Sequence, residues 1–239
     1  MRGKKNNNPF VLKQFTVLHH LCAHKVGFDG VLLGAWTNFT ESNSILDIGT
    51  GSGLLALMAA QKNAVAKIYA VEMDENSVLQ ARENFANSLW DQRLEVKQGN
   101  FFEMPFDAKF DHIVTNPPYF IDGLKTPFEN RTTARHFTRE QFGEFMMKTA
   151  GLLNAGGRLS MIVPGANEDD ILSLVNHAGY YLTRKCRVFT KNADTAERIL
   201  LECSLERHTV EENNLFVYDA TGKHSAEYCK LTSDFYPHY

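Results

Sequence analysis

The tetrapeptide Asn116-Pro-Pro-Tyr119 combines residue types that could act on a nitrogen nucleophile. It follows a β-branched run, and open α/β folds bind their ligands at the carboxyl ends of their strands. The amine of adenine and a side-chain amide are poor nucleophiles because their lone pairs are delocalised, and hydrogen-bond acceptors can orient such a nitrogen. Tyr119 supplies a ring that can stack on a base, with Phe120 beside it. A rigid turn that merely ends the strand would explain the prolines, but not the asparagine before them or the aromatic ring after them.

A second group of such residues is the turn Asp47-Ile-Gly-Thr-Gly-Ser-Gly53, which joins a predicted strand to a predicted helix. Its three glycines let the backbone bend sharply and approach a ligand without a Cβ clash. Glu72 closes the next predicted strand, 25 residues after Asp47, where an acid can accept hydrogen bonds from both hydroxyls of a ribose. These features predict a nucleotide-sized ligand; the alternative is a tight packing turn beside a solvated glutamate.

The spacing of the glycines separates two kinds of nucleotide site. A dinucleotide site has the pattern GxGxxG and aims helix amides at a pyrophosphate, whereas this turn is GxGxG preceded by an acid. It resembles the S-adenosylmethionine (SAM) site of class I methyltransferases. Asn100 stands where that class places an adenine-binding residue, usually aspartate, and its amide oxygen can still accept a hydrogen bond. The cofactor-binding residues that the resemblance implies are Asp47, Gly49, Gly51, Gly53, Glu72, Met73, Asn100, Phe101 and Asn116.

The elements that must position these residues follow from the hydrophobic pattern. From residue 44 onward, β-branched runs alternate with helical patterns, which is typical of βαβ units around a parallel sheet. We expect the Rossmann-like α/β fold of class I SAM-dependent methyltransferases, with a mostly parallel seven-stranded sheet that ends in an antiparallel hairpin. The predicted strands are 44–47, 67–72, 94–98, 112–115, 158–163, 180–189 and 199–205. The predicted helices are 53–62, 76–87, 138–153 and 168–178; the third begins with a capping box at Thr138 and is stopped by Gly156-Gly157.

The pattern also predicts how the chain is organised. Residues 1–43 form an N-terminal arm and cap segment, 44–205 the methyltransferase core, and 206–239 a C-terminal extension with an edge strand at 215–218 and a helical turn at 225–231. The irregular stretch 116–139 is longer than an ordinary connection, which favours a binding loop over a spacer.

Composition excludes several classes of protein. The 239 residues are 44% hydrophobic and 22% charged, as in an ordinary globular chain, and no apolar stretch is long enough to span a membrane. The start of the chain lacks the apolar core of a secretory signal, so we expect a cytoplasmic protein. The four cysteines form no CxxC pair, and the histidines and cysteine of 19–24 have no partner cluster at zinc spacing, so we expect no metal.

The segment Lys25-Val-Gly-Phe-Asp-Gly-Val-Leu-Leu-Gly34 narrows the choice of methyltransferase. It resembles a block that precedes the SAM loop in the bacterial valine-tRNA adenine methyltransferase family. Asn116 to Phe120, Ala134-Arg-His136 and the terminal Asp234-Phe-Tyr236 resemble that family as well. The resemblance implies methylation of the exocyclic N6 amine of the adenine beside the anticodon of a valine tRNA. In the family pattern the Asn116 side-chain oxygen and the Pro117 carbonyl accept hydrogen bonds from the two amine N–H groups, and Tyr119 completes the catalytic set.

A net charge of −3 requires that any RNA be bound through local basic surface. The expected tRNA contacts are Lys25, Tyr119, Phe120, Arg131, Arg135, Arg184 and Lys185, although ordinary solvated surface would explain the basic ones equally well. We expect a monomer, with an oligomer left open.

Three alternatives to the tRNA enzyme remain open at this point. Glutamine methyltransferases of peptide release factors also carry Asn-Pro-Pro-Tyr, but add a helical N-terminal domain, and here only 43 residues precede the first core strand. DNA adenine methyltransferases need a target-recognition domain. A non-catalytic nucleotide-binding module would keep the glycine turn but has no reason to keep Asn116 and Tyr119.

Overall fold

The computed structural model describes residues 8–118, 137–190 and 194–237. The chain forms two compact units, Met1–Met104 together with Lys230–Tyr239, and Pro105–Cys229. The sequence instead predicts segment boundaries after residues 43 and 205, where the alternation of strands and helices begins and ends. These boundaries stay predictions.

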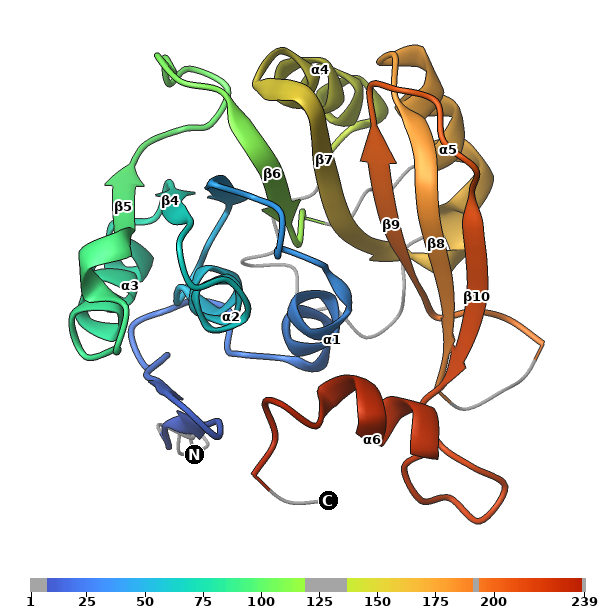
Figure 1. Cartoon of the computed structure of the whole chain (residues 1–239), viewed down its shortest axis with the longest axis horizontal. Coiled ribbons are helices and arrows are strands. Elements are labelled where there is room, and N and C mark those ends of the chain that lie inside the picture. Colours follow the sequence, from blue (N-terminus) through green and yellow to red (C-terminus); the bar gives the residue numbers. More distant parts are fainter. Residues whose placement is uncertain (1–7, 119–136, 191–193, 238–239) are drawn as a thin grey trace, which may run out of the picture. The chain divides into compact units, whose positions relative to one another are not determined.

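The first unit contains a parallel sheet that is extended by one strand with each βα unit (Figure 1). A short hairpin of β1 (Phe10–Val11) and β2 (Thr16–Val17) leads into helix α1 (Phe28–Trp36). The strands lie in the order β3-β4-β5. The predicted strands and helices between residues 44 and 98 are confirmed to within one residue. Their observed bounds are β3 (Ser44–Ile48), α2 (Leu54–Lys62), β4 (Lys67–Glu72), α3 (Glu75–Ala86) and β5 (Leu94–Gln98), with the 3-10 turn η1 (Asp91–Arg93) before β5.

Helix α1 packs on α2 at a very short distance, because two glycines face that neighbour. A Cβ atom on Gly30 would lie 2.9 Å from Cδ2 of Leu54, and one on Gly34 would lie 2.5 Å from Sδ of Met58. Gly30 and Gly34 are four residues apart and therefore share one side of the helix. The Lys62 ammonium donates to the Ala35 carbonyl at 2.6 Å, and also to those of Gly34 and Thr37. It thereby satisfies carbonyls that the end of α1 leaves without helical partners.

The second unit is mixed, with strands in the order β10-β8-β9-β7-β6 and the helices α4 and α5 in contact with each other (Figure 1). β6 and β7 are parallel, and β9 runs antiparallel to both β7 and β8, so the predicted hairpin is confirmed. The capping box of α4 is also confirmed, because Thr138 accepts from the Gln141 amide while the Gln141 side chain accepts from the Thr138 amide. The bounds are β6 (Phe110–Thr115), α4 (Arg139–Gly151), β7 (Leu153–Pro164), the 3-10 turn η2 (Gly165–Asn167), α5 (Glu168–His177), β8 (Tyr181–Phe189), β9 (Arg198–Ser204), β10 (Glu211–Phe216) and α6 (Ala226–Thr232).

Strand β10 is additional to the seven strands predicted for the core, and it corresponds to the edge strand predicted in the C-terminal extension. It begins four residues before the edge strand predicted at 215–218, and it pairs with β8 in parallel. The last helical turn, expected at 225–231, is α6.

The prediction that Gly156-Gly157 ends the preceding helix is wrong. Helix α4 ends at Gly151, and both glycines lie inside β7. The register between β6 and β7 shifts between Phe110 and His112, where Phe110 faces Leu153 but His112 faces Arg158. The extra residues of β7 form a bulge, and Gly156 adopts the left-handed φ of +72° that such a bulge favours in glycine. The glycines therefore reshape a strand instead of stopping a helix.

Among the described residues, no helix has both the length and the apolar character needed to cross a bilayer.

Candidate cofactor and acceptor sites

The glycine loop joins β3 to α2, and all three of its glycines have left-handed backbone angles. Their φ values are +71° at Gly49, +56° at Gly51 and +87° at Gly53. A Cβ atom on Gly49 or Gly51 would meet nothing within 4 Å, whereas one on Gly53 would lie 2.5 Å from the Phe85 ring. Gly53 is therefore needed for packing. Gly49 and Gly51 are needed for their conformation, and they border open space in which a ligand can approach the backbone.

Asp47, at the end of β3, is fully buried behind this loop. Its Oδ2 accepts from Thr50 Oγ1 at 2.5 Å and from the Ala56 amide at 3.1 Å. Its Oδ1 is buried without a hydrogen-bond partner among the described residues. Burial raises the pKa of this carboxyl to about 7, although the Thr50 and Ala56 hydrogen bonds oppose the rise. An orphaned acceptor oxygen behind an open glycine loop fits a ligand that carries a hydrogen-bond donor or a positive charge.

Glu72 ends β4, and its carboxylate holds two turns together. Oε2 accepts from the Gly51 amide at 3.0 Å, and Oε1 accepts from the amides of Met73 and Asp74 at 2.8 and 2.9 Å. Asp74 then caps α3 by accepting from the Ser77 amide. A carboxylate has about four acceptor positions, so the three bonds present leave capacity for one ribose hydroxyl, where the sequence suggested two. Sequence reasoning missed this role of Glu72 in shaping the glycine loop.

Asn100 follows β5 and is half-buried. Its amide nitrogen donates to Glu103 at 2.9 Å, and its amide oxygen accepts from the Phe102 amide at 3.2 Å. Phe101 is buried, with its ring edge-on to that of Phe102, while Met73 is 40% exposed. The amide oxygen of Asn100, which was expected to bind adenine, is thus shared with a local turn, and its contact with a cofactor stays a prediction.

The acceptor motif lies in the second unit, directly after β6. Thr115 is buried, Asn116 is half-buried, Pro117 is buried and Pro118 is exposed. A residue before proline is restricted to extended conformations, which applies to both Asn116 and Pro117, and a proline has no amide to donate. The segment is therefore stiff, and Asn116 stands at a fixed point after the end of the strand. Tyr119, Phe120, Arg131 and Arg135 lie outside the described residues, and their predicted roles stay predictions.

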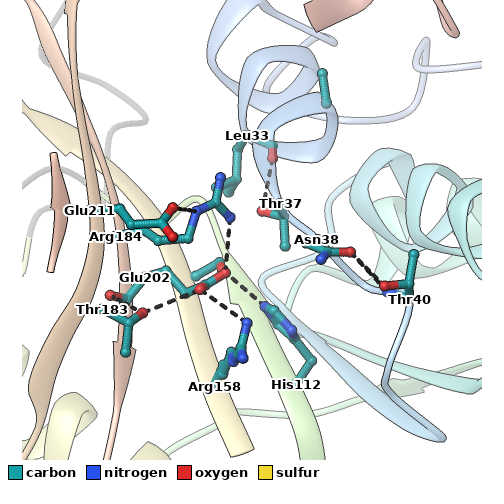
Figure 2. A network of polar contacts seen from close by, with 12 residues as sticks. Leu33, Thr37, Asn38, Thr40, His112, Arg158, Thr183, Arg184, Glu202 and Glu211 are labelled. Carbon is teal, nitrogen blue, oxygen red and sulfur yellow. Dashed lines mark hydrogen bonds and ion pairs between the residues drawn. The ribbon is translucent and has the colours of Figure 1, made fainter. Parts of the chain in front are cut away.

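Arg184 was expected to contact RNA, and it lies in a network of polar contacts on β7, β8, β9 and β10. Its guanidinium lies 3.3 Å from Oε2 of Glu202 and 3.9 Å from Oε2 of Glu211 (Figure 2). Glu202 is fully buried. It also forms an ion pair with Arg158 at 3.5 Å and accepts a hydrogen bond from the Thr183 hydroxyl at 3.2 Å. Arg184 thus contributes charge balance to a buried carboxylate.

Lys185 was expected to contact RNA as well, and it is only 5% exposed. Its ammonium lies 3.0 Å from both Glu168 and Glu212, and the same two carboxylates bind Arg187. The Arg187 guanidinium is the main reason that the pKa of Glu168 is lowered. Lys25, in contrast, is exposed and donates to the carbonyls of His19 and His20. The predicted phosphate contacts of these residues stay predictions, and for Lys185 they would compete with two ion pairs.

Within the described ranges, no group of three or more His, Cys, Asp or Glu residues could hold a metal ion.

Comparisons with known proteins define the class of the chain. The model of the methyltransferase small domain family matches residues 30–169, which include both the glycine loop and Asn116. A predicted O-methyltransferase from Agrobacterium tumefaciens aligns with a TM-score of 0.66 and 17% identity over 87% of this chain and 96% of that one. A putative RNA methyltransferase from Pyrococcus horikoshii aligns with a TM-score of 0.52 and 18% identity over 72% and 80%. The protein is a methyltransferase with the fold of the class I SAM-dependent methyltransferases.

More similar relatives define the family. A protein of Bacteroides thetaiotaomicron named tRNA1(Val) (adenine(37)-N6)-methyltransferase is 40% identical over 233 residues, 97% of this chain and 98% of the relative. Its namesake from Pasteurella multocida is 38% identical over 239 residues, 99% of each chain. The chain belongs to the tRNA1(Val) (adenine(37)-N6)-methyltransferase family, which confirms the resemblance predicted from its motifs.

Proposed function

We propose that this chain transfers the methyl group of SAM to the exocyclic N6 amine of adenine 37 in tRNA1(Val). The observation that carries the proposal is its 36–40% identity, over nearly the full length of both chains, to relatives named for that reaction. The stiff Asn116-Pro117 segment also supports the proposal, because it can hold hydrogen-bond acceptors at a fixed position for the acceptor amine.

The residues around the glycine loop fit SAM. Gly49 and Gly51 border open space, and the Asp47 Oδ1 is an unpartnered buried acceptor among the described residues. In the proposed site Gly49 and Gly51 let the backbone approach the homocysteine arm, Glu72 accepts from the ribose, and Asn100 and Phe101 line the adenine. When bound, SAM supplies an electrophilic methyl group on a sulfonium.

The chain's contribution to the acceptor is orientation. The lone pair of the adenine amine is delocalised into the ring, so the nitrogen must be drawn toward tetrahedral geometry before it can attack. In the proposal the Asn116 side-chain oxygen and the Pro117 carbonyl accept hydrogen bonds from the two N–H groups of the amine and so fix the direction of its lone pair. Because the two prolines restrict the backbone, little entropy is lost when the amine binds. Tyr119 stacks on the base.

The test is product identification. The purified protein is incubated with radiolabelled SAM and either a pool of transcribed tRNAs or a peptide release factor, and the digested products are separated. We expect label in N6-methyladenosine from tRNA. Label on a glutamine of the release factor would instead contradict the tRNA substrate while leaving the amine chemistry in place.

The variant Asn116→Ala tests the role of Asn116 in orienting the amine. Methyl transfer should fall by about a hundredfold or more, as when one preorganised hydrogen-bonding group is removed from an active site. The resemblance also places Asn116 among the cofactor-binding residues, but in this proposal its side chain acts on the acceptor amine. The calorimetric Kd for SAM should therefore change by less than about twofold. An equal loss of SAM affinity would mean that the roles are misassigned.

A further inference from the structure

Asn84 is a polar residue on α3 that is only 2% exposed, and both its amide oxygen and its amide nitrogen are hydrogen-bonded. Its Oδ1 accepts from the Leu18 amide at 2.9 Å, and its Nδ2 donates to the Leu18 carbonyl at 2.7 Å. The same Nδ2 donates to the Ser52 carbonyl at 2.7 Å. Leu18 belongs to the segment that precedes α1, and Ser52 lies in the glycine loop between Gly51 and Gly53. One buried side chain therefore joins the two.

The residue next to Asn84 contacts the same loop. The Phe85 ring fills the space that a Cβ atom on Gly53 would need, 2.5 Å away. Ser52 and Gly53 are both buried. The carboxyl-terminal part of α3 thus holds the buried half of the glycine loop by one hydrogen bond and one ring contact, while Gly49 and Gly51 face open space.

The segment that Asn84 binds is itself well anchored. Val17 is fully buried, and the Phe15 ring packs edge-on to Trp90 at 5.6 Å. His19 Nδ1 accepts from the Val26 amide at 2.9 Å, and its Nε2 lies 3.1 Å from the Asn8 carbonyl. Burial lowers the pKa of His19, which favours the neutral ring that this pattern needs. The Leu18 backbone is therefore a fixed point against which the glycine loop can be held.

We infer that Asn84 is a positioning residue for the SAM site, which fixes the glycine loop by tying Ser52 to the backbone of Leu18. This inference rests on the proposed function, because it assumes that the loop binds SAM. It predicts that loss of the Asn84 amide loosens the loop and weakens SAM binding, without altering the groups that act on the amine. Binding of SAM in turn steadies residues around Leu18, because coupling between two sites is reciprocal.

Gln80 provides a matched control one helical turn earlier on α3. It is fully buried, and its Oε1 accepts from the Leu21 amide at 3.2 Å while its Nε2 donates to Glu83 at 2.8 Å. Gln80 therefore binds the N-terminal segment as Asn84 does, and neither of these two hydrogen bonds reaches the glycine loop.

The experiment compares Asn84→Ala and Gln80→Ala with the wild type by calorimetric titration of SAM into the full chain. The Kd should rise about tenfold in Asn84→Ala, the size of one lost hydrogen bond, and less than about twofold in Gln80→Ala. At saturating SAM, kcat on tRNA should stay within about twofold in both. If Asn84 had a purely structural role, both variants would have a lower melting temperature. The affinity for SAM would then not fall selectively in Asn84→Ala while kcat stays unchanged.

Three results would contradict the inference or its basis. Equal Kd values in folded Asn84→Ala and wild type would overturn the role of Asn84 and leave the proposed function standing, as would equal losses in both variants. Failure of the wild type to bind SAM would overturn the proposed function instead.

Should Asn84→Ala not fold, hydrogen exchange on the wild type decides the matter. SAM should slow exchange of the Leu18 amide more than that of the Leu21 amide, and an unchanged Leu18 rate would refute the coupling.

Discussion

The buried carboxyl of Asp47 makes the stability of this protein depend on pH in an unusual direction. Its pKa is raised from 3.8 to about 7, chiefly by burial. The unfolded chain releases this proton near pH 4, whereas the folded chain keeps it to about pH 7. The contribution to stability is therefore fully present below about pH 3.8 and is lost as the pH rises to about 7. At about 1.4 kcal/mol for each pH unit, the loss amounts to about 4 kcal/mol.

Asp47→Asn removes this titration while it keeps the shape of the side chain and an oxygen to accept from Thr50 and Ala56. Urea unfolding without SAM at several pH values between 4 and 8 gives the free energy of unfolding of both proteins. The wild-type value minus the variant value should fall by about 4 kcal/mol over this range and level off above about pH 7. Titrations of other carboxyls occur in both proteins and cancel in the difference.

Thr50→Val supplies the control, because it removes a hydrogen bond that lowers the pKa of Asp47. The fall should then extend to higher pH. A difference between wild type and Asp47→Asn that is flat from pH 4 to 8, or that rises with pH, would refute this reasoning about the buried carboxyl.

Three further predictions concern other parts of the chain. Gly51→Ala should cost about 1–2 kcal/mol of stability, because φ is +56° there, and should weaken SAM binding in calorimetry, whereas Gly151→Ala in α4 should do neither. Gly34→Ala should cost about 1–3 kcal/mol in urea unfolding, because its Cβ would lie 2.5 Å from Met58 Sδ, and Gly34→Ala with Met58→Ala should cost less than the two single changes added. Arg184→Ala with Lys185→Ala should lower the slope of log Kd for tRNA against log salt by about 0.7–0.9 for each phosphate that these side chains neutralise, and an unchanged slope would assign both residues to their ion pairs alone.

The strands and helices of the core could be predicted because their hydrophobic pattern is local. Helix α1 could not, since Gly30 to Trp36 are all buried and therefore show no amphipathic period, and Gly30 and Gly34 are poor helix formers. The close approach of Met58 that makes those glycines useful is visible only once α2 is in place. The bulge at Gly156 was missed for a similar reason, because a glycine pair that follows a helical pattern looks the same whether it ends a helix or bends a strand.

The glycine turn could be predicted because it is a contiguous motif between a strand and a helix, with a spacing that carries information. The role of Asn84 could not be predicted, because a single asparagine on a helix is usually a solvated residue. Its hydrogen bonds to Leu18 and Ser52 appear only in the folded structure. Lys185 illustrates the opposite case, a residue that looks solvated in the sequence and is buried in the structure. Its basic neighbours Arg184 and Arg187 suggest a free positive charge. In the structure, however, Glu168 and Glu212 form ion pairs with Lys185.

The central claim, methyl transfer to one adenine amine of one tRNA, is tested most directly with two transcripts of tRNA1(Val) that differ only at nucleotide 37. The purified chain with radiolabelled SAM should label the transcript that has adenine at 37 and leave the transcript with guanine unlabelled, with the label recovered as N6-methyladenosine. Equal labelling of both transcripts, or label recovered in any other nucleoside, would contradict the account.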